Sequence, residues 1–150
     1  MNELAIKQFE SLISDTDDEI SILSNASAFI KELMDDTNWV GFYLNKEEVL
    51  YLGPFQGKVA CTVIEFTKGV CGHCATTRKP VIVEDVHQFP GHIACDSASN
   101  SELVIPIIIN ERLYGLLDLD SPSFARFKKE DEVLLEKMME VLADRLGFIL

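Results

Sequence analysis

The stretch that decides the fold is LVIPIIINERLYGLLDLD, residues 103–120. It begins with a continuous apolar run, turns at Asn110-Glu111, and ends in alternating leucine and aspartate. Two strand-like segments joined by a two-residue turn predict an antiparallel hairpin. In its second strand Asp118 and Asp120 share one face and the leucines beside them share the other, because side chains alternate along a strand. Two neighbouring carboxylates on one face repel each other mildly, so that face is either exposed to solvent or part of a site.

The sequence on either side of this hairpin predicts an α+β fold. Helical spacing of apolar residues predicts helices up to about Ser14, over Glu19–Met34, from Gly69 to about Thr77, and from about Lys128 onward as a long final helix. Alternation between turn residues predicts strands at Asn38–Leu44, Val49–Phe55 and Val81–Glu84, and a third strand over Lys58–Phe66 that contains Cys61. We expect five or six strands in one antiparallel sheet, within a single domain spanning residues 1–150.

Composition narrows the function classes. The 150 residues carry 25 acidic and 13 basic side chains, a net charge of −12. This balance argues against nucleic acid and against anionic membrane surfaces as partners, since both attract basic proteins. The N-terminus lacks the basic and apolar regions of an export signal, so we expect a cytoplasmic protein. In a reducing compartment, the four cysteines are expected to serve catalysis, redox chemistry or metal binding rather than structural disulfides.

A polar stretch precedes the hairpin and is the first candidate site. Residues 89–102 read FPGHIACDSASNSE, which places a thiol at Cys95 among serines, an asparagine, a histidine and carboxylates. Such residues favour loops, where chemistry is concentrated. When the two strands pair from the turn at Asn110-Glu111, Glu102 lies at the same end of the hairpin as Asp118 and Asp120. We therefore expect three acids and Cys95 to converge, although a polar turn with a buried structural cysteine is the plain alternative.

The segment Cys71-Gly72-His73-Cys74 leaves two further interpretations open. A Cys-x-x-Cys pair at a helix start is typical of disulfide oxidoreductases, but the βαβ context of those proteins is missing here. A zinc site drawn from Cys71, Cys74, Cys95 and the histidines His73, His87 and His92 is conceivable, but the sequence shows no second close pair of ligands. We expect no metal and no bound cofactor.

Two aromatic residues also need an interpretation. Trp39 and Tyr43 are four positions apart, so they share a face of the predicted strand. Spacing alone favours a role in the core, although a Trp and Tyr pair facing acids would suit a pocket for a small cationic or methyl-bearing ligand.

Several motifs together resemble one family. These are residues 38–43 (NWVGFY), 69–72 (GVCG), 84–87 (EDVH), the whole stretch 89–102, and 115–121 (GLLDLDS). They closely resemble the free methionine-(R)-sulfoxide reductases, which are small stand-alone GAF-domain enzymes. The resemblance covers nearly the whole chain, and the segment ending in Ser99-Asn100-Ser101-Glu102 is its most specific part.

The resemblance implies a fold, an activity and roles for individual residues. It implies a GAF-like α+β domain in which a central antiparallel sheet of about six strands carries the N- and C-terminal helices on one face. It implies that Cys95 attacks the sulfoxide and that Cys61 and Cys71 are its partners in disulfide formation. Glu102, Asp118 and Asp120 would bind and activate the substrate, with Trp39 and Tyr43 lining the pocket. Cys74 departs from the family pattern, so which thiol resolves the intermediate stays open.

The expected activity is reduction of free methionine-(R)-sulfoxide through a cysteine sulfenic acid and an intramolecular disulfide, with thioredoxin as reductant and a homodimer as the assembly. Two alternatives belong to other classes. One is a non-catalytic GAF module that senses a small molecule or redox state, although sensing alone gives no reason for several thiols beside acids. The other is a general thiol-disulfide oxidoreductase that works through Cys71 and Cys74.

Overall fold

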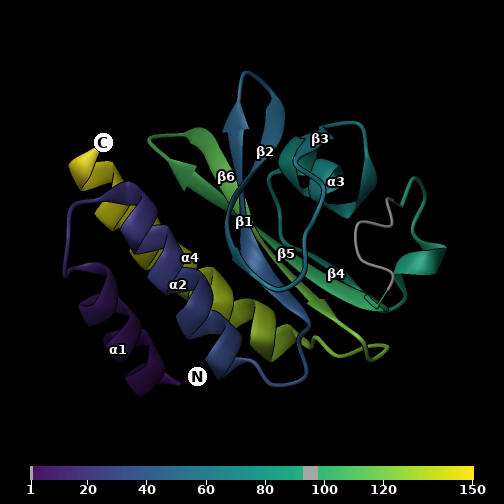
Figure 1. Cartoon of the computed structure of the whole chain (residues 1–150), viewed down its shortest axis with the longest axis horizontal. Helices are drawn as coiled ribbons and strands as arrows, with labels where there is room; N and C mark the ends of the chain where they lie inside the picture. Colours follow the sequence, from purple (N-terminus) through teal and green to yellow (C-terminus); the bar gives the residue numbers. More distant parts are fainter. Residues whose placement is uncertain (1, 93–97) are drawn as a thin grey trace.

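The computed structural model describes residues 2–92 and 98–150 and contains one six-stranded sheet. All strand pairs are antiparallel and the spatial order is β3-β2-β1-β6-β5-β4. The strands are β1 (Trp39–Lys46), β2 (Val49–Gln56), β3 (Val63–Glu65), β4 (Val81–Val83), β5 (Ser101–Ile109) and β6 (Arg112–Ser121). The predicted hairpins are thus confirmed, and β1 and β6 join them at the centre of the sheet (Figure 1).

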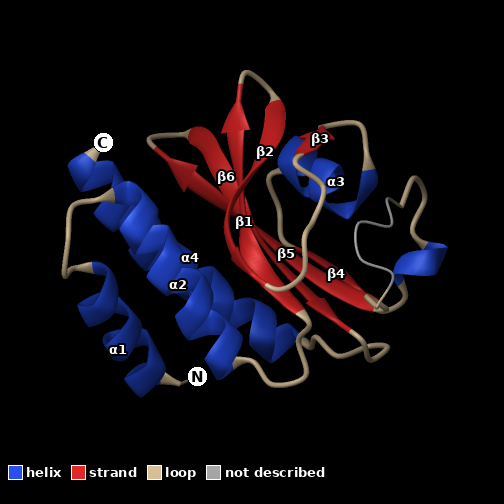
Figure 2. Ribbon diagram, viewed as in Figure 1, coloured by secondary structure: helices blue, strands red, loops and turns tan. Residues whose placement is uncertain are grey.

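Helices cover the two faces of the sheet unequally (Figure 2). The terminal helices lie on one face: α1 (Glu3–Ile13), α2 (Glu19–Leu33) and α4 (Lys129–Ile149). The short helix α3 (Gly69–Thr77) lies on the other, and a single 3₁₀ turn follows at Val86–Gln88. The α+β architecture with the terminal helices on one face is as predicted.

Alternation along the strands divides the apolar residues into two cores. Phe42, Leu117 and Leu119 are fully buried on the face that packs against α2 and α4. Trp39 and Tyr43 belong to a second buried cluster that includes the inner side of α3. Because side chains alternate, residues 118 and 120 of β6 point to this second side, between the sheet and α3.

Tight turns fix the register of both long hairpins. Asn110 and Glu111 adopt φ values of 51° and 67°, as a type I′ turn requires. Glu47 and Glu48 do the same at 54° and 64°, and Asn45 supports that turn by accepting a hydrogen bond from the Glu48 N–H (3.0 Å). Further from the turns, the pairing shifts by one residue between Gly41 and Tyr43 on β1 and between Ile107 and Ile108 on β5. Since a slip of one residue changes which side chains share a face, the turns and these irregularities together decide which residues reach the site.

The predicted strand over Lys58–Phe66 is wrong for most of its length. Only Val63–Glu65 forms β3, and Cys61 lies in the loop before it. Backbone carbonyls in this loop accept hydrogen bonds from side chains instead of a strand: Trp39 Nε1 donates to the Lys58 carbonyl (3.1 Å) and the Tyr43 hydroxyl to the Cys61 carbonyl (2.9 Å). The loop therefore passes beside the two aromatic residues.

Candidate active site

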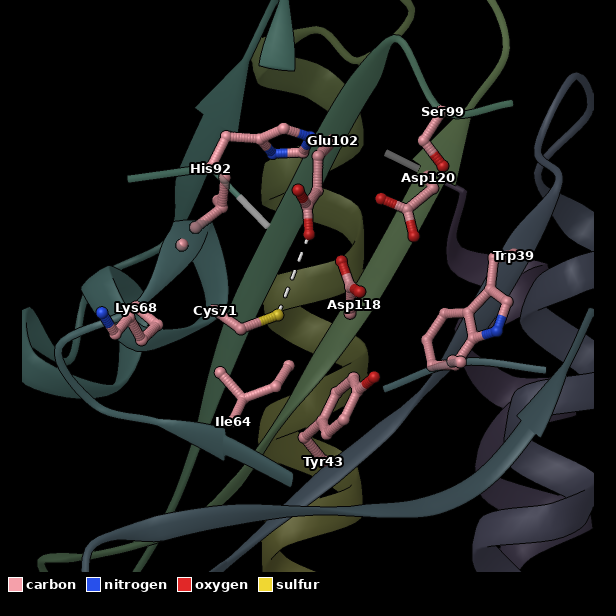
Figure 3. A pocket seen from close by; sticks show the side chains of 13 residues that line it. Trp39, Tyr43, Ile64, Lys68, Cys71, His92, Ser99, Glu102, Asp118 and Asp120 are labelled. Carbon is pink, nitrogen blue, oxygen red and sulfur yellow. Dashed lines mark hydrogen bonds between the residues drawn. The ribbon is translucent and has the colours of Figure 1, made fainter. Parts of the chain in front are cut away.

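The register of the central strands brings the three predicted acids together. Glu102 on β5 lies directly opposite Asp120 on β6, and Asp118 lies opposite Val104, diagonal to Glu102. On the other side of β6, Trp39 is opposite Asp120. Neighbouring strands are only about 4.8 Å apart, so all three carboxyl groups are close neighbours on one face (Figure 3).

Two of these acids are buried. Glu102 is 7% exposed and Asp118 is 5% exposed, whereas Asp120 is half-buried. The Cys71 thiol, from α3, donates to Glu102 Oε2 over 3.8 Å. Asp118 Oδ1 has no hydrogen-bond partner among the described residues. A buried carboxylate oxygen without a donor is costly to a folded protein, which indicates a group held ready for a ligand.

Burial and mutual repulsion shift the protonation of this cluster. Burial, followed by the charge of Asp120, raises the pKa of Glu102 from 4.5 to about 8. Burial and the neighbouring Glu102 raise the pKa of Asp118 well above its ordinary value. The pKa of the Cys71 thiol is also raised, first by burial and then by the charge of Asp118. The cluster therefore holds protons at neutral pH, with Glu102 and Asp118 as carboxyl groups able to donate one.

Stacked aromatic rings form the opposite wall. The Trp39 indole stacks on Phe55 (ring centroids 5.2 Å apart) and on Tyr43 (5.8 Å). Gly41 permits the first stack, because a Cβ atom there would lie 2.3 Å from Cβ of Phe55. Both predicted aromatic residues are thus core residues, each 2% exposed, and pocket walls as well.

Sequence reasoning missed several residues that line the same pocket. They are Ala60, Ile64, Lys68, Gly69, Val70, His92 and Ser99. His92 and Ser99 stand in the polar stretch, whose composition was the available signal. Lys68 and Gly69 begin α3 beside Cys71, where proximity in sequence to a predicted site residue could have identified them. Ala60, in the loop before β3, and Ile64, on β3, carry no signal, because apolar residues alone do not show which of them face a pocket.

The cysteines have different environments. Cys95, the predicted attacking residue, lies outside the described residues. Cys61 is half-buried and disulfide-bonded, whereas Cys71 and Cys74 are free thiols. Cys74 is fully buried, and burial raises its pKa to about 12. Thiol-disulfide exchange needs an accessible thiolate, so the environment of Cys71 and Cys74 argues against an oxidoreductase that works through this pair.

The histidines of the conceivable zinc set have other partners. His87 Nε2 is 2.9 Å from Asn100 Oδ1, and the His92 ring meets the His87 ring edge-on. His73 packs edge-on against Phe89. Within residues 2–92 and 98–150, the potential metal ligands that cluster are Cys71, Glu102 and Asp118, without a histidine.

The chain is similar to known proteins over most of its length. The GAF domain model matches residues 18–150. A relative from Escherichia coli, named free methionine-R-sulfoxide reductase, is 44% identical over 136 residues, which cover 91% of this chain and 82% of the relative. The chain belongs to the GAF family and, within it, to the free methionine-R-sulfoxide reductases.

Solved structures of this reductase family superpose on nearly the whole chain. The reduced form of the Staphylococcus aureus protein has a TM-score of 0.92 at 47% identity, covering 95% of this chain and 93% of that one. The Neisseria meningitidis reductase in complex with its substrate has a TM-score of 0.91 at 40% identity, covering 95% and 86%. The protein is therefore an oxidoreductase with a GAF fold.

Proposed function

We propose that this protein reduces free L-methionine-(R)-sulfoxide to L-methionine with electrons from its own thiols. The observation that carries the proposal is the buried cluster of Glu102, Asp118 and Cys71 facing the aromatic wall of Trp39 and Tyr43. The names of the relatives give the substrate. The cluster and the aromatic wall supply what that substrate requires: a proton donor, carboxyl oxygens that accept hydrogen bonds from an ammonium group, and an apolar surface for a thioether methyl.

The proposed reaction begins with attack of the Cys95 thiolate on the sulfoxide sulfur. Two electrons pass from the cysteine sulfur to the sulfoxide sulfur, and the oxygen ends on the cysteine as a sulfenic acid while methionine leaves. The leaving oxygen must be protonated. Glu102 and Asp118 supply this proton, because their raised pKa values keep carboxyl protons available at neutral pH.

The acid cluster also explains selection of the free amino acid. Asp120 is half-buried at the edge of the pocket, where its charge attracts a substrate ammonium group, and the buried carboxyl groups offer oxygen atoms that accept hydrogen bonds from that group. A methionine sulfoxide within a peptide carries an uncharged amide at that position. Binding it would leave buried acids without a partner, which is unfavourable.

A second thiol must remove the hydroxyl of the sulfenic acid as water, forming a disulfide. We propose Cys61 for this first step. Cys71 is a free thiol whose burial and neighbouring acids raise its pKa, so little of it is the thiolate that the step needs. During substrate reduction, Cys71 donates a hydrogen bond to Glu102. It takes part in disulfide formation only later, when thioredoxin reduces the enzyme.

The remaining proposals concern assembly and location. Apolar side chains on the terminal helices stay exposed in the isolated chain, with Leu4 66%, Ile20 68% and Phe148 81% exposed, which supports a homodimer that pairs through these helices.

Among the described residues, no helix has the length and apolar character needed to traverse a bilayer. We propose a cytoplasmic enzyme.

A thiol count tests this function. Reduced protein mixed with methionine-R-sulfoxide should lose two thiols for each methionine formed. A non-catalytic GAF sensor, the alternative, would lose none. Cys95→Ser should form no methionine and no sulfenic acid trappable by dimedone, while Cys74→Ser, which changes a buried thiol of the same chain, should keep both. Substantial turnover by Cys95→Ser would overturn the assignment of the nucleophile.

A further inference from the structure

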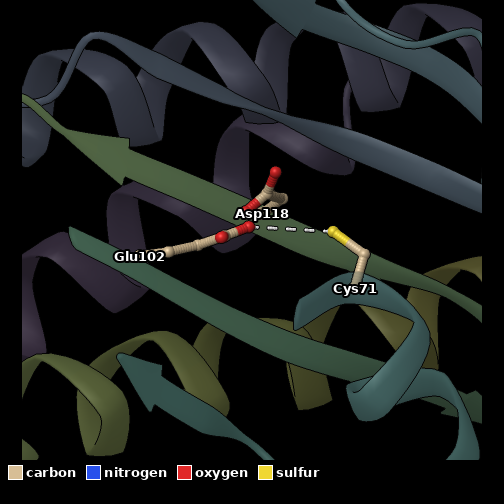
Figure 4. A group of neighbouring side chains, drawn as sticks. All are labelled: Cys71, Glu102 and Asp118. Carbon is tan, nitrogen blue, oxygen red and sulfur yellow. Dashed lines mark hydrogen bonds between the residues drawn. The ribbon is translucent and has the colours of Figure 1, made fainter. Parts of the chain in front are cut away.

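The side chains of Cys71, Glu102 and Asp118 have the arrangement of a three-ligand metal site (Figure 4). One sulfur and two carboxylate oxygens lie within 4.8 Å of one another, and Cys71 Sγ is 3.8 Å from Glu102 Oε2. In tetrahedral zinc with bonds of about 2.3 Å to sulfur and 2.0 Å to oxygen, adjacent ligand atoms are about 3.5 Å apart. The pair of Cys71 and Glu102 is within about 0.3 Å of this spacing, and the remaining pairs, all within 4.8 Å, would contract by about 1 Å or less on metal binding.

A second observation points to a ligand at this place. Asp118 is 5% exposed, its Oδ1 has no partner among the described residues, and the residue lines the pocket. Three anionic ligands would more than neutralise a divalent cation, and the pocket that all three line gives access for a fourth ligand such as water. We propose that Cys71, Glu102 and Asp118 bind one borderline-soft divalent cation, with Zn²⁺ as the best match, in place of the substrate.

The identity of the donors sets the selectivity. A thiolate favours Zn²⁺, Cd²⁺ and Co²⁺ over Mg²⁺ and Ca²⁺, which prefer oxygen ligands only. The metal binds these donors as a thiolate and two carboxylates. The cation would bind the same carboxyl groups that are proposed to bind the substrate ammonium group. Competition between the cation and the substrate therefore rests on the proposed function.

The test uses the Cys61→Ser/Cys95→Ser protein, which lacks the two thiols proposed to attack the sulfoxide and to form the first disulfide. Co²⁺ titration should give a thiolate-to-cobalt charge-transfer band that saturates at one metal per chain, and Zn²⁺ should abolish it. Adding Cys71→Ser should remove the band, and adding Asp118→Asn should weaken Zn²⁺ binding by about tenfold or more. Cys74→Ser, a change of the neighbouring buried thiol, should leave both unchanged. A band that survives Cys71→Ser or depends on Cys74 would overturn the site.

Two readouts separate this proposal from the proposed function. The cobalt spectrum requires no turnover, so it decides the metal site even if the protein reduces no sulfoxide. Methionine-R-sulfoxide, which this variant cannot turn over, should displace Co²⁺ in proportion to its own binding. Calorimetric binding of sulfoxide with an unchanged cobalt band would refute the shared site. Circular dichroism of each variant checks that the fold is intact.

Discussion

Replacing Glu102 by glutamine should stabilise this protein at neutral and alkaline pH. The pKa of Glu102 is about 8 in the folded chain and 4.5 in its ordinary state. Below about pH 4.5 this group is protonated in both the folded and the unfolded chain and does not change the free energy of unfolding. As pH rises from about 4.5 to about 8, the group ionises in the unfolded chain first, so the free energy of unfolding falls. At about 1.4 kcal/mol for each pKa unit, the interval corresponds to about 5 kcal/mol of unfolding free energy.

Only part of this energy should return in the variant, since Asp118 and Asp120 remain and share the repulsion. We expect Glu102→Gln to gain about 2–4 kcal/mol at pH 8, which for a chain of this size raises the melting temperature by about 5–15 °C. Near pH 4.5 the two proteins should be about equally stable. Urea unfolding across this pH range measures the difference, and Glu65→Gln, an exposed position on β3 of the same sheet, is the matched control.

The pH dependence is the decisive feature. A gain that is the same at every pH would mean that glutamine merely packs better. Parallel curves for Glu102→Gln and the parent protein would refute the claim that Glu102 is held protonated by burial, and with it the assignment of this group as a proton donor.

Three further predictions concern catalysis and packing. Asp120→Asn should slow single-turnover sulfoxide reduction by about 10–100-fold, the usual loss on removing a charged hydrogen-bond partner of the substrate ammonium group, with an unchanged or higher melting temperature; a normal rate would exclude Asp120 from the mechanism. Cys61→Ser and Cys71→Ser should both form methionine in the first turnover but fail in recycling by thioredoxin, and collapse of the first turnover in Cys61→Ser would contradict this division. Gly41→Ala should lower stability by about 1–3 kcal/mol in thermal unfolding, because its Cβ would overlap Phe55.

The hairpin was predictable because its signals are local. Asn110-Glu111 supplies the turn, and the alternation of Asp118 and Asp120 with leucines assigns the faces without knowledge of any other strand. The same reasoning correctly placed Glu102 at the end of the hairpin that holds the two aspartates. The exact pairing of Glu102 with Asp120 also depends on a one-residue register shift between Ile107 and Ile108, which the turn does not predict. The helix from Gly69 to Thr77 also has its predicted bounds.

The loop that carries Cys61 was not predictable in this way. Its apolar residues resemble a strand, and only the hydrogen bonds from Trp39 and Tyr43 to its carbonyls show why it stays irregular. Those donors stand about twenty residues earlier in the chain. No local pattern records that a side chain from another strand will take up the backbone groups of this segment.

The sequence by itself determined the two hairpins and the set of acids, because turn chemistry and alternation act over a few residues, whereas the face covered by the terminal helices was implied by the family resemblance. Tertiary structure alone decided how those acids behave. Packing of α3 against the sheet buries Glu102 and Asp118, brings the Cys71 thiol to 3.8 Å from Glu102 Oε2, and raises their pKa values. Protonation depends on how much water the rest of the fold removes from a group, and that quantity is set by residues distant in the chain.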